Sequence, residues 1–499
     1  MGKKNHGKVC GRGKLPVKDS NLQNSTPRKL SRQKRNEVNQ IVEKLLKAST
    51  NIVSSPNVSK EWETYLEIQK LLEKVIQAES DMKVPLTDRS SHLEQFMSWM
   101  RQHGAEINGI KIGQFPAYEY GLQAEKDLEE GELMIAVPRK LMLTTETIAD
   151  SVLGPLLRKD AMLQHMPNVA LSLLLLVEKF SPSSFWKPYL AILPQEYTTV
   201  LYFKTHELQE LKGSPSLEPA LKQCRSIARQ YAYFNKLFQT SADPASDLLR
   251  DVFSYEQYCW AVSTVMTRQN FVPSSDGNSM LNALIPLWDM ANHINGKLTT
   301  DFNVSQQRSE CMAVRPFRAG EQVFIFYGPR TNSELLVHNG FVYPDNKHDA
   351  LPIRLGVSRA DPLQPLRAKL LARLGLPTTG DFLLKSGTDP VDGRLLAFLR
   401  IFSMGQEHLE HWLESERASD LVYIDCALET EVETRTWTFL QTRIKLLLSA
   451  YPTTLEVDKE LLTSTSVASP CQRLAIQMRI SEKLIFKRAL EYVEQHVRP

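Results

Sequence analysis

Two short segments of this 499-residue sequence hold most of the side chains that could do chemistry. Residues 284–293 end in Asn292-His293, and residues 318–328 carry a Gly-Glu turn and end in Tyr327-Gly328. The six cysteines are scattered without a Cys-x-x-Cys pair, and no Gly-x-Gly-x-x-Gly motif follows a strand-like segment. The sequence therefore predicts no metal site, and a nucleotide-type cofactor would need a pocket that is not of the Rossmann type.

The chain that must position these residues changes its hydrophobic pattern several times. Apolar residues have helical spacing over about 36–100, 150–272 and beyond 345, whereas short extended runs with glycines occupy about 104–145 and 281–328. A doubly wound sheet would need regular alternation of strands and helices, which is absent. The pattern predicts an α+β fold, in which a β-rich domain is split by a helical insert and followed by an all-helical C-terminal domain. The expected boundaries are a basic tail at 1–35, a helical segment at 36–103, the split domain at 104–330 with its insert at about 150–272, and the helical domain at 345–499.

The composition is that of a soluble globular protein with two or three domains, because 42% of the residues are hydrophobic and 23% are charged. The longest apolar run, residues 169–177, is too short to span a membrane, and the N-terminus lacks the apolar segment of a secretory signal. These features, with the unpaired cysteines, predict a protein of the cytoplasm, with the nucleus as a second location.

Charge is distributed unevenly along the chain. Residues 1–35 contain eleven Lys or Arg residues and one acidic residue, Asp19, so we expect a disordered, solvated tail. Nuclear import or nucleic-acid contact is the alternative role for this tail. The remaining 49 basic and 56 acidic residues give the rest of the chain a net charge of −7, which argues against nucleic-acid binding by the folded part.

The Asn292-His293 pair, the Gly-Glu turn and the Tyr327-Gly328 step together resemble the two signature motifs of SET-domain methyltransferases. From about residue 60 to the end, the chain also resembles the actin-specific protein-histidine methyltransferases of the SET superfamily. This resemblance implies a split SET domain, a C-terminal domain like that of the plant Rubisco large-subunit methyltransferase, S-adenosylmethionine as cofactor, and a monomer that acts on actin. The segments that carry it are Ser151–Leu156, Ser184–Trp186, Arg229–Phe234, Met266–Asn270, Ala283–Met290 and Phe326–Arg330.

Methyl transfer from a sulfonium is an in-line displacement that needs neither a metal nor a covalent intermediate. Catalysis then depends on positioning the methyl group and the acceptor nitrogen in a channel without water. It also depends on polar groups that point at the charge developing in the transition state. The acceptor nitrogen must be neutral, which a histidine with a pKa near 6.5 mostly is at pH 7, whereas a lysine must first lose a proton. A side-chain amide can orient an imidazole because it both donates and accepts hydrogen bonds.

The resemblance implies specific roles for individual residues. Tyr327 and Asn270 are the catalytic candidates: Asn270 would orient the imidazole, and Tyr327 would direct its hydroxyl toward the transfer axis. Trp288 and Tyr327 would wall the acceptor, and Arg330 would bind the flanking peptide. The implied cofactor-binding residues are Arg89, Tyr118, Glu119, Tyr120, Arg268, Asp289, Met290, Ala291, Asn292, His293, Asn339, Gly340 and Phe341.

One segment departs from the family pattern. SET domains carry Gly-x-Gly in the first cofactor-binding turn, and this chain has Glu119-Tyr120-Gly121 there, preceded by Tyr118 where actin-specific members have an acid. If the first glycine requires a positive φ, glutamate at this position costs about 1 kcal/mol.

Two alternatives to a histidine methyltransferase stay open at this stage. A protein-lysine methyltransferase acting on histones or other proteins would use the same cofactor and the same signature motifs. A catalytically weak SET-like module that binds a protein partner is the second alternative, and Glu119 is its main support. A cofactor-binding measurement separates this module from both enzymes.

Overall fold

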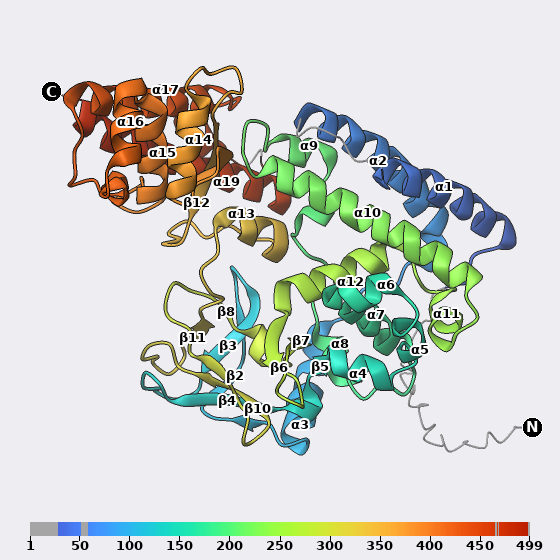
Figure 1. Ribbon diagram of the computed structural model, residues 1–499. Helices are drawn as coiled ribbons and strands as arrows, with labels where there is room; N and C mark the ends of the chain where they lie inside the picture. Colours follow the sequence, from blue (N-terminus) through green and yellow to red (C-terminus); the bar gives the residue numbers. More distant parts are fainter. Residues whose placement is uncertain (1–27, 51–57, 465–466, 468, 498–499) are drawn as a thin grey trace, which may run out of the picture.

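The computed structural model describes residues 28–50, 58–464, 467 and 469–497 (Figure 1). Most of the expected basic tail lies outside these residues. Helix α1 (Arg32–Thr50) nevertheless begins inside the stretch assigned to the tail, and Arg35 forms an ion pair with Asp251 at 2.5 Å. Residues 32–35, which were assigned to the tail, are therefore part of the folded body.

Three long helices lie side by side along one edge of the molecule (Figure 1). They are α1, α2 (Val58–Ala78) and α10 (Leu217–Thr240), and the apolar side chains on their facing sides, such as Leu45 and Leu72, are fully buried. After α2 the chain forms η1 (Glu79–Met82), η2 (Arg89–His92) and α3 (Leu93–Gln102) and then enters the β-rich region.

The β-rich region contains three small sheets, with strand orders β1-β4-β10-β9, β2-β3-β11-β8 and β5-β7-β6. Most neighbours are antiparallel, but β8 and β11 run parallel and pair Asn292 with Phe324 and His293 with Ile325. This pairing brings the two signature segments together. The strands are β1 (Glu106–Ile107), β2 (Ile110–Phe115), β3 (Glu119–Ala124), β4 (Leu133–Pro138), β5 (Leu143–Thr144), β6 (Asn270–Pro273), β7 (Met280–Leu284), β8 (Asn292–His293), β9 (Thr300–Asn303), β10 (Arg308–Met312) and β11 (Gln322–Ile325).

A helical insert separates β5 from β6, as the periodicity predicts. Its helix α7 is buried at every residue from Val169 to Val177, because it packs between the sheets and α12. Two short 3-10 turns, η3 (Arg139–Leu141) and η5 (Trp288–Met290), flank the insert in sequence, and η4 (Val200–Tyr202) lies inside it. The helices of the insert are α4 (Thr145–Asp150), α5 (Gly154–Leu157), α6 (Ala161–His165), α7 (Pro167–Phe180), α8 (Lys187–Ile192), α9 (Thr205–Gln209), α10, α11 (Pro244–Leu249) and α12 (Tyr255–Arg268).

The C-terminal region has a hydrophobic core of its own and stands apart from the sheets in Figure 1. Its described residues are helical except for two antiparallel strands, β12 (Ala350–Gly356) and β13 (Thr379–Lys385), which are joined through a helix, so the expectation of an all-helical domain is wrong at these strands. From Leu351 to the end of β12, buried residues alternate with more exposed ones, which is the period of a strand. The helices are α13 (Asn332–Glu334), η6 (Leu335–Asn339), α14 (Gln364–Arg373), α15 (Gly393–Ser403), α16 (Gln406–Glu414), η7 (Ala418–Val422), α17 (Thr430–Ser449), α18 (Leu455–Thr463) and α19 (Pro470–Val497).

Helix α19 ties this region to the insert through buried polar contacts. Ser214 and Ser216, which follow α9, both donate hydrogen bonds to the carboxylate of Glu482, at 2.7 and 2.8 Å. Arg479 pairs with Asp458 at 2.6 Å and also contacts Glu210 of the insert. Because these groups are buried and mutually satisfied, they fix how α19 crosses the insert.

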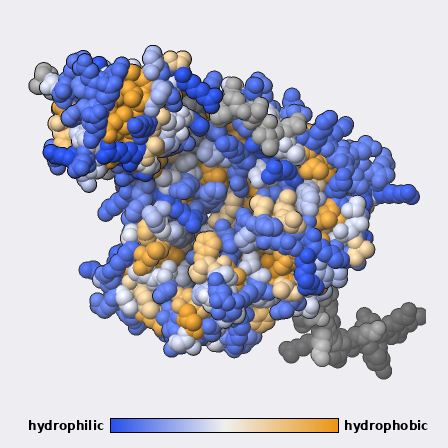
Figure 2. All heavy atoms as spheres, viewed as in Figure 1, coloured by the Kyte–Doolittle hydropathy of each residue, from blue (hydrophilic) through white to orange (hydrophobic). Residues whose placement is uncertain are grey.

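The α+β prediction, with a split β-rich domain and a helical insert, is confirmed by this architecture. Figure 2 shows a largely hydrophilic surface with apolar patches on the C-terminal region and on the half of the molecule that holds the sheets. None of the helices within the described residues is long and apolar enough to cross a membrane. Across the same described ranges, no cluster of His, Cys, Asp and Glu has the arrangement of a metal site.

Candidate functional site

A cavity of about 970 Å³ lies where β3, the end of α12, η5, β8 and the segment after η6 converge. Eight stretches of the chain contribute to its wall, and the last of them is the beginning of α19. Of the residues expected to hold the cofactor, Ala291 alone does not line this cavity. The others are Arg89, Tyr118, Glu119, Tyr120, Arg268, Asp289, Met290, Asn292, His293, Asn339, Gly340 and Phe341.

The parallel pairing of β8 with β11 positions Asn292 and His293 at this cavity. The amide of Asn292 donates to the carbonyl oxygen of Tyr120 at 3.3 Å, which joins β8 to β3. A Cβ atom at Gly121 would lie 2.9 Å from that amide nitrogen and 2.7 Å from Nε2 of Gln322. A side chain at position 121 would require Asn292 and Gln322 to shift, so the second glycine of the turn serves the close approach of Asn292.

His293 is held in a neutral form. The backbone N–H of Tyr327 donates to its Nδ1 at 3.2 Å, and the ring lies among Phe326, Tyr327 and Phe341. Burial, aided by the nearby charge of Arg330, lowers the pKa of His293 to about 4. The cavity therefore presents an uncharged imidazole at neutral pH, which is compatible with a cationic ligand.

Arg268 and Asp289 form a buried charged pair in the wall of the cavity. Their side chains are 3.4 Å apart, Asp289 is fully buried, and the hydroxyl of Tyr189 donates to Asp289 at 2.5 Å. Burial disfavours the charge on Arg268, but Asp289 and the neighbouring tyrosines Tyr189 and Tyr197 outweigh it and raise its pKa. Burial raises the pKa of Asp289 in turn, although Arg268 opposes the shift. Nε of Arg268 and Oδ1 of Asp289 are buried without a hydrogen-bond partner, and such atoms at a cavity wall are available to a polar ligand.

Arg89 contributes a second guanidinium to the same cavity. Its Nε donates to the carbonyl oxygen of Ile192 at 2.8 Å, and the guanidinium lies over the ring of Tyr120 at 5.1 Å. Its Nη1 is 2.8 Å from a carboxylate oxygen of Glu119, which begins β3 with a φ of 60°. The side chain of Arg89 is buried, whereas that of Glu119 is 60% exposed.

A smaller cavity of about 80 Å³ adjoins the larger one, and the four expected acceptor residues Asn270, Trp288, Tyr327 and Arg330 all line it together with Ala291. The amide nitrogen of Asn270 donates to the carbonyl oxygen of Arg268 at 3.1 Å, which fixes the orientation of the amide. Nη1 of Arg330 donates to Oδ1 of Asn339 at 2.8 Å. The residues that line both cavities, and so form the wall between them, are Thr267, Arg268, Asp289, Tyr327 and Asn339.

Tyr327 stands in this shared wall with its hydroxyl fixed. The hydroxyl donates to the carbonyl oxygen of Ala291 at 2.7 Å, and burial raises the pKa of the phenol to about 12. The group is therefore neutral at physiological pH, with an oxygen lone pair at the junction of the two cavities.

Several residues of the site lie outside the motifs that the sequence contains. Tyr189 holds Asp289, and Tyr197 lines the large cavity and bonds to the hydroxyl of Thr264 at 2.8 Å. Thr198 donates to the carbonyl of Gly340 at 2.7 Å, which anchors the segment that carries Phe341. These residues lie in the helical insert about 70 to 140 positions from their partners, so no local motif could have indicated them. Pro470, Cys471 and Gln477 of α19 also line the cavity.

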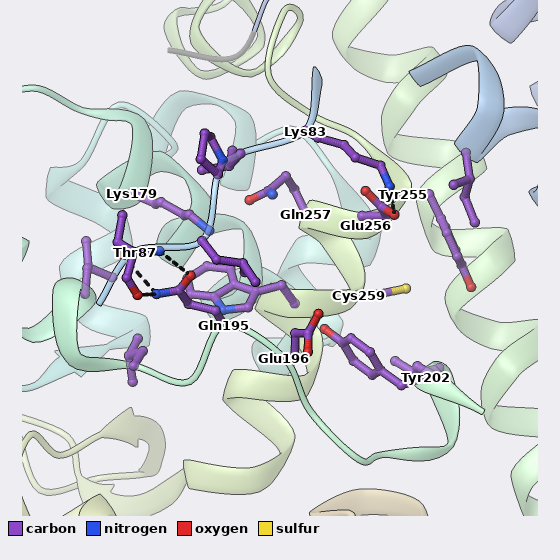
Figure 3. Close-up of a pocket in the computed structure, with 18 of the residues that line it drawn as sticks. Lys83, Thr87, Lys179, Gln195, Glu196, Tyr202, Tyr255, Glu256, Gln257 and Cys259 are labelled. Carbon is purple, nitrogen blue, oxygen red and sulfur yellow. Dashed lines mark hydrogen bonds and ion pairs between the residues drawn. The ribbon is translucent and has the colours of Figure 1, made fainter. Parts of the chain in front are cut away.

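A second large cavity, of about 540 Å³, borders the cavity of about 970 Å³ and shares Glu196 and Tyr202 with it (Figure 3). The side chain of Lys179 reaches toward it, and its ammonium lies 3.6 Å from the centre of the Trp260 ring. Burial lowers the pKa of Lys179 to about 7. Lys83 pairs with Glu256 at 3.4 Å elsewhere in the wall, and Glu196 is a further charged residue that lines the cavity. Polar groups do not converge here as they do at Arg268.

Two family models match the chain. The SET domain matches residues 119–328, which supply much of the wall of both cavities, and the Rubisco LSMT substrate-binding domain matches residues 358–486. The two matches follow one another along the chain in the order expected from the sequence.

Curated relatives extend this similarity to most of the chain. The actin-histidine N-methyltransferases of Canis lupus familiaris and Homo sapiens are 42% identical over 442 residues, which cover 88% of this chain and 75% and 74% of theirs. That of Mus musculus is 41% identical over 455 residues, which cover 89% of this chain and 76% of its own. Among solved structures, Rubisco LSMT bound to sinefungin and monomethyllysine has a TM-score of 0.65 at 24% identity, over 81% of this chain and 92% of that one. Rubisco LSMT bound to AdoMet has a TM-score of 0.63 at 24% identity, over 83% and 93%.

Proposed function

The chain belongs to the SET-domain actin-histidine N-methyltransferases, and on that premise we propose that it transfers a methyl group from S-adenosylmethionine to Nε2 of a histidine in actin. The observation that supports this most is the wall shared by two cavities, a large one and one of about 80 Å³. Tyr327 stands in that wall, so a cofactor on one side and an acceptor ring on the other would meet at its hydroxyl. Such a meeting point is what an in-line displacement requires.

The residues of the large cavity fit the cofactor. S-adenosylmethionine supplies an electrophilic methyl group on a positively charged sulfur. Nε of Arg268 and Oδ1 of Asp289 are unpartnered polar atoms for its amino-acid part, and Arg89 offers a second guanidinium. Asn292 and the neutral His293 would hold the adenine, and an uncharged imidazole does not repel the sulfonium.

The acceptor side would select a flat, neutral ring. Trp288 and Tyr327 wall the small cavity, and Asn270 lies where its amide could bond the ring nitrogen that is not methylated. The hydroxyl of Tyr327, fixed by Ala291, would orient its lone pair toward the charge that develops on the transferred methyl. Arg330, braced by Asn339, would contact the peptide beside the acceptor.

The surroundings of the small cavity favour a protein as substrate over a free amino acid. A groove of about 330 Å³ continues from Asn270 and Trp288 over β6, β7 and β9. Three exposed apolar side chains, Phe271, Met280 and Val304, line it, and their exposed fractions are 60% or more. Apolar surface beside a reaction channel is typical of a docking site for a polypeptide. We further propose that the protein acts as a monomer in the cytoplasm, with the nucleus as a second location, and that it binds actin through this groove.

A lysine methyltransferase is the alternative that the acceptor residues can distinguish. Lysine has no second ring nitrogen, so a bond from Asn270 would serve only a histidine. Replacing Asn270 with Val should reduce activity toward histidine by about 1–3 kcal/mol, the usual loss when a specific polar partner is removed. Activity toward a lysine at the same position should fall less, because a more apolar channel favours the neutral amine.

The test uses two actin-derived peptides, with His or Lys at the acceptor position, and labelled S-adenosylmethionine. Wild-type protein should prefer the His peptide, Asn270→Val should reduce that preference, and Asn278→Val, which removes an amide from the exposed turn after β6, should leave it unchanged. A wild-type preference for Lys would contradict the histidine assignment. A preference for His that Asn270→Val leaves unchanged would contradict the role of Asn270 and retain the function. Binding of cofactor with transfer to neither peptide would favour a SET-like binding module.

A further inference from the structure

Glu119 combines two features that are unusual for a residue at the edge of a cavity. It is one of three residues other than glycine with a positive φ within the described ranges, and its carboxylate lies 2.8 Å from Nη1 of Arg89. A left-handed backbone disfavours residues with a side chain, so this conformation is maintained by the surrounding structure. The strained backbone directs the carboxylate toward the guanidinium.

Arg89 cannot follow Glu119 if that side chain moves. Its Nε is bonded to the carbonyl oxygen of Ile192, its guanidinium lies over Tyr120, and only 9% of its side chain is exposed. The guanidinium is therefore a fixed, buried cation whose Nη atoms face the cavity. Glu119, by contrast, is 60% exposed and has solvent beside it.

Both arginines of the cavity already have a carboxylate partner. Asp289 pairs with Arg268, and it is fully buried and bonded to Tyr189, so it has no route to solvent. Glu119 pairs with Arg89 and, in the described part of the chain, with no other cation. A third carboxylate, Glu196, lies at the exposed rim. An incoming carboxylate that seeks Nη1 of Arg89 must therefore replace Glu119.

We propose that Glu119 is an internal competitor for the carboxylate of the cofactor: it occupies Arg89 in the free protein and must turn toward solvent before the amino-acid end of S-adenosylmethionine binds. This inference rests on the proposed function. It adds a residue that sets cofactor affinity, and it gives a role to the glutamate that replaces the first glycine of the turn. The ion pair makes the free state more favourable, and binding is weaker by the energy of the lost pair.

The experiment compares wild-type protein with Glu119→Gln and with the control Glu125→Gln, by calorimetry with two ligands. Glu125 is an exposed carboxylate just beyond the end of β3, so its replacement removes the same charge without touching Arg89. S-adenosylhomocysteine carries the amino-acid carboxylate, and 5′-methylthioadenosine is a related thioether nucleoside without it. Neither ligand transfers a methyl group, so the readout is binding alone.

Glu119→Gln should bind S-adenosylhomocysteine about three- to tenfold more tightly than wild type, because a half-buried ion pair no longer competes. Its affinity for 5′-methylthioadenosine should equal that of wild type, and Glu125→Gln should match wild type with both ligands. Unchanged or weaker binding of S-adenosylhomocysteine by Glu119→Gln would overturn the inference, as would equal tightening of both ligands. If wild type and both variants bind no S-adenosylhomocysteine at millimolar concentration, the proposed function fails and the inference falls with it.

Discussion

The large cavity that Arg89 and Arg268 line and the second large cavity, shown in Figure 3, share residues at their border. They differ in the polar and charged groups of their walls. In the first, Arg89 and Arg268 each pair with a carboxylate, and two buried polar atoms have no partner. In the second, Lys83 and Glu256 form an exposed pair, and the ammonium of Lys179 contacts an indole ring and forms no ion pair with a described carboxylate.

This difference indicates that the first cavity is a ligand-binding site and that the second results from imperfect packing. A polar ligand needs several groups that converge from different elements, and the first cavity provides two arginines and two buried polar atoms without a partner. A single desolvated lysine is a cost to the folded state, and the contact of Lys179 with the Trp260 ring offsets only part of it. The comparison can be tested by removing one charge from each cavity, and by removing the hydroxyl from the wall between cofactor and acceptor.

The largest effect is expected from Arg268→Met. This variant leaves the buried carboxylate of Asp289 without its cation, and an uncompensated buried charge costs about 3–5 kcal/mol of unfolding free energy. Denaturant unfolding measures this loss, and calorimetry with S-adenosylhomocysteine should show cofactor binding abolished. The control Arg417→Met removes an arginine whose side chain is 78% exposed in its pair with Asp420, and it should change stability by less than about 1 kcal/mol.

A second variant separates stability from binding at the same pair. Arg268→Met combined with Asp289→Asn removes both charges, so it should recover part of the lost stability and none of the cofactor binding. If Arg268→Met lost no more stability than Arg417→Met, the buried pair would not be the organising feature of this cavity.

The sequence was sufficient for the parts of the site that lie in contiguous motifs. Asn292, His293 and Tyr327 could be assigned together because two short segments carry them, and the α+β fold followed from the change between periods of 3.6 and 2. The strand pair β12–β13 was missed because its strands lie between helices and contain Pro352 and Gly380, which obscure the alternation.

Contacts between distant positions could not be predicted. Tyr189 reaches Asp289 across one hundred positions, and the tertiary fold alone brings them together. The departure at Glu119 was visible in the sequence, but its partner was not, because Arg89 lies thirty positions earlier and is directed to it by Ile192 and Tyr120. Motifs reveal which residues are special, and only the fold reveals what they contact.

An effect of intermediate size, on turnover, is expected from Tyr327→Phe. The hydroxyl bonded to Ala291 stands in the wall between the two cavities, so its loss should lower turnover at least about tenfold, roughly 1.4 kcal/mol of barrier. Binding of S-adenosylhomocysteine should change little, because the ring remains. Tyr343→Phe is the matched control: its ring also contacts His293 and lines only the larger cavity, so turnover should persist. Unaltered turnover of Tyr327→Phe would mean that the hydroxyl has no part in the transition state.

The smallest effect on function is expected from Lys179→Met in the second cavity. The pKa of Lys179 in the folded protein is about 7, below the value of about 10.4 expected in the unfolded chain. Between these values the unfolded chain binds the extra proton, so wild-type stability should rise with pH from about 7 to 10, and below pH 7 the folded state carries the full cost of the charge. Lys179→Met removes that cost, so it should stabilise the protein by about 1–2 kcal/mol at pH 7 and flatten the pH dependence above it. Lys140→Met, at an exposed position, should do neither.

The same variant tests whether the second cavity matters to the first. Cofactor affinity and turnover of Lys179→Met should stay within about twofold of wild type, because the ammonium contacts Trp260 and no residue of the charged pairs around Arg89 and Arg268. Calorimetry and the peptide assay at pH 7 measure both quantities. A loss of cofactor binding beyond tenfold, in a variant that unfolds at the same or a higher denaturant concentration, would show that the two cavities act together and that the lone lysine is functional. Destabilisation at pH 7 would instead show that Lys179 has a favourable interaction that offsets its burial.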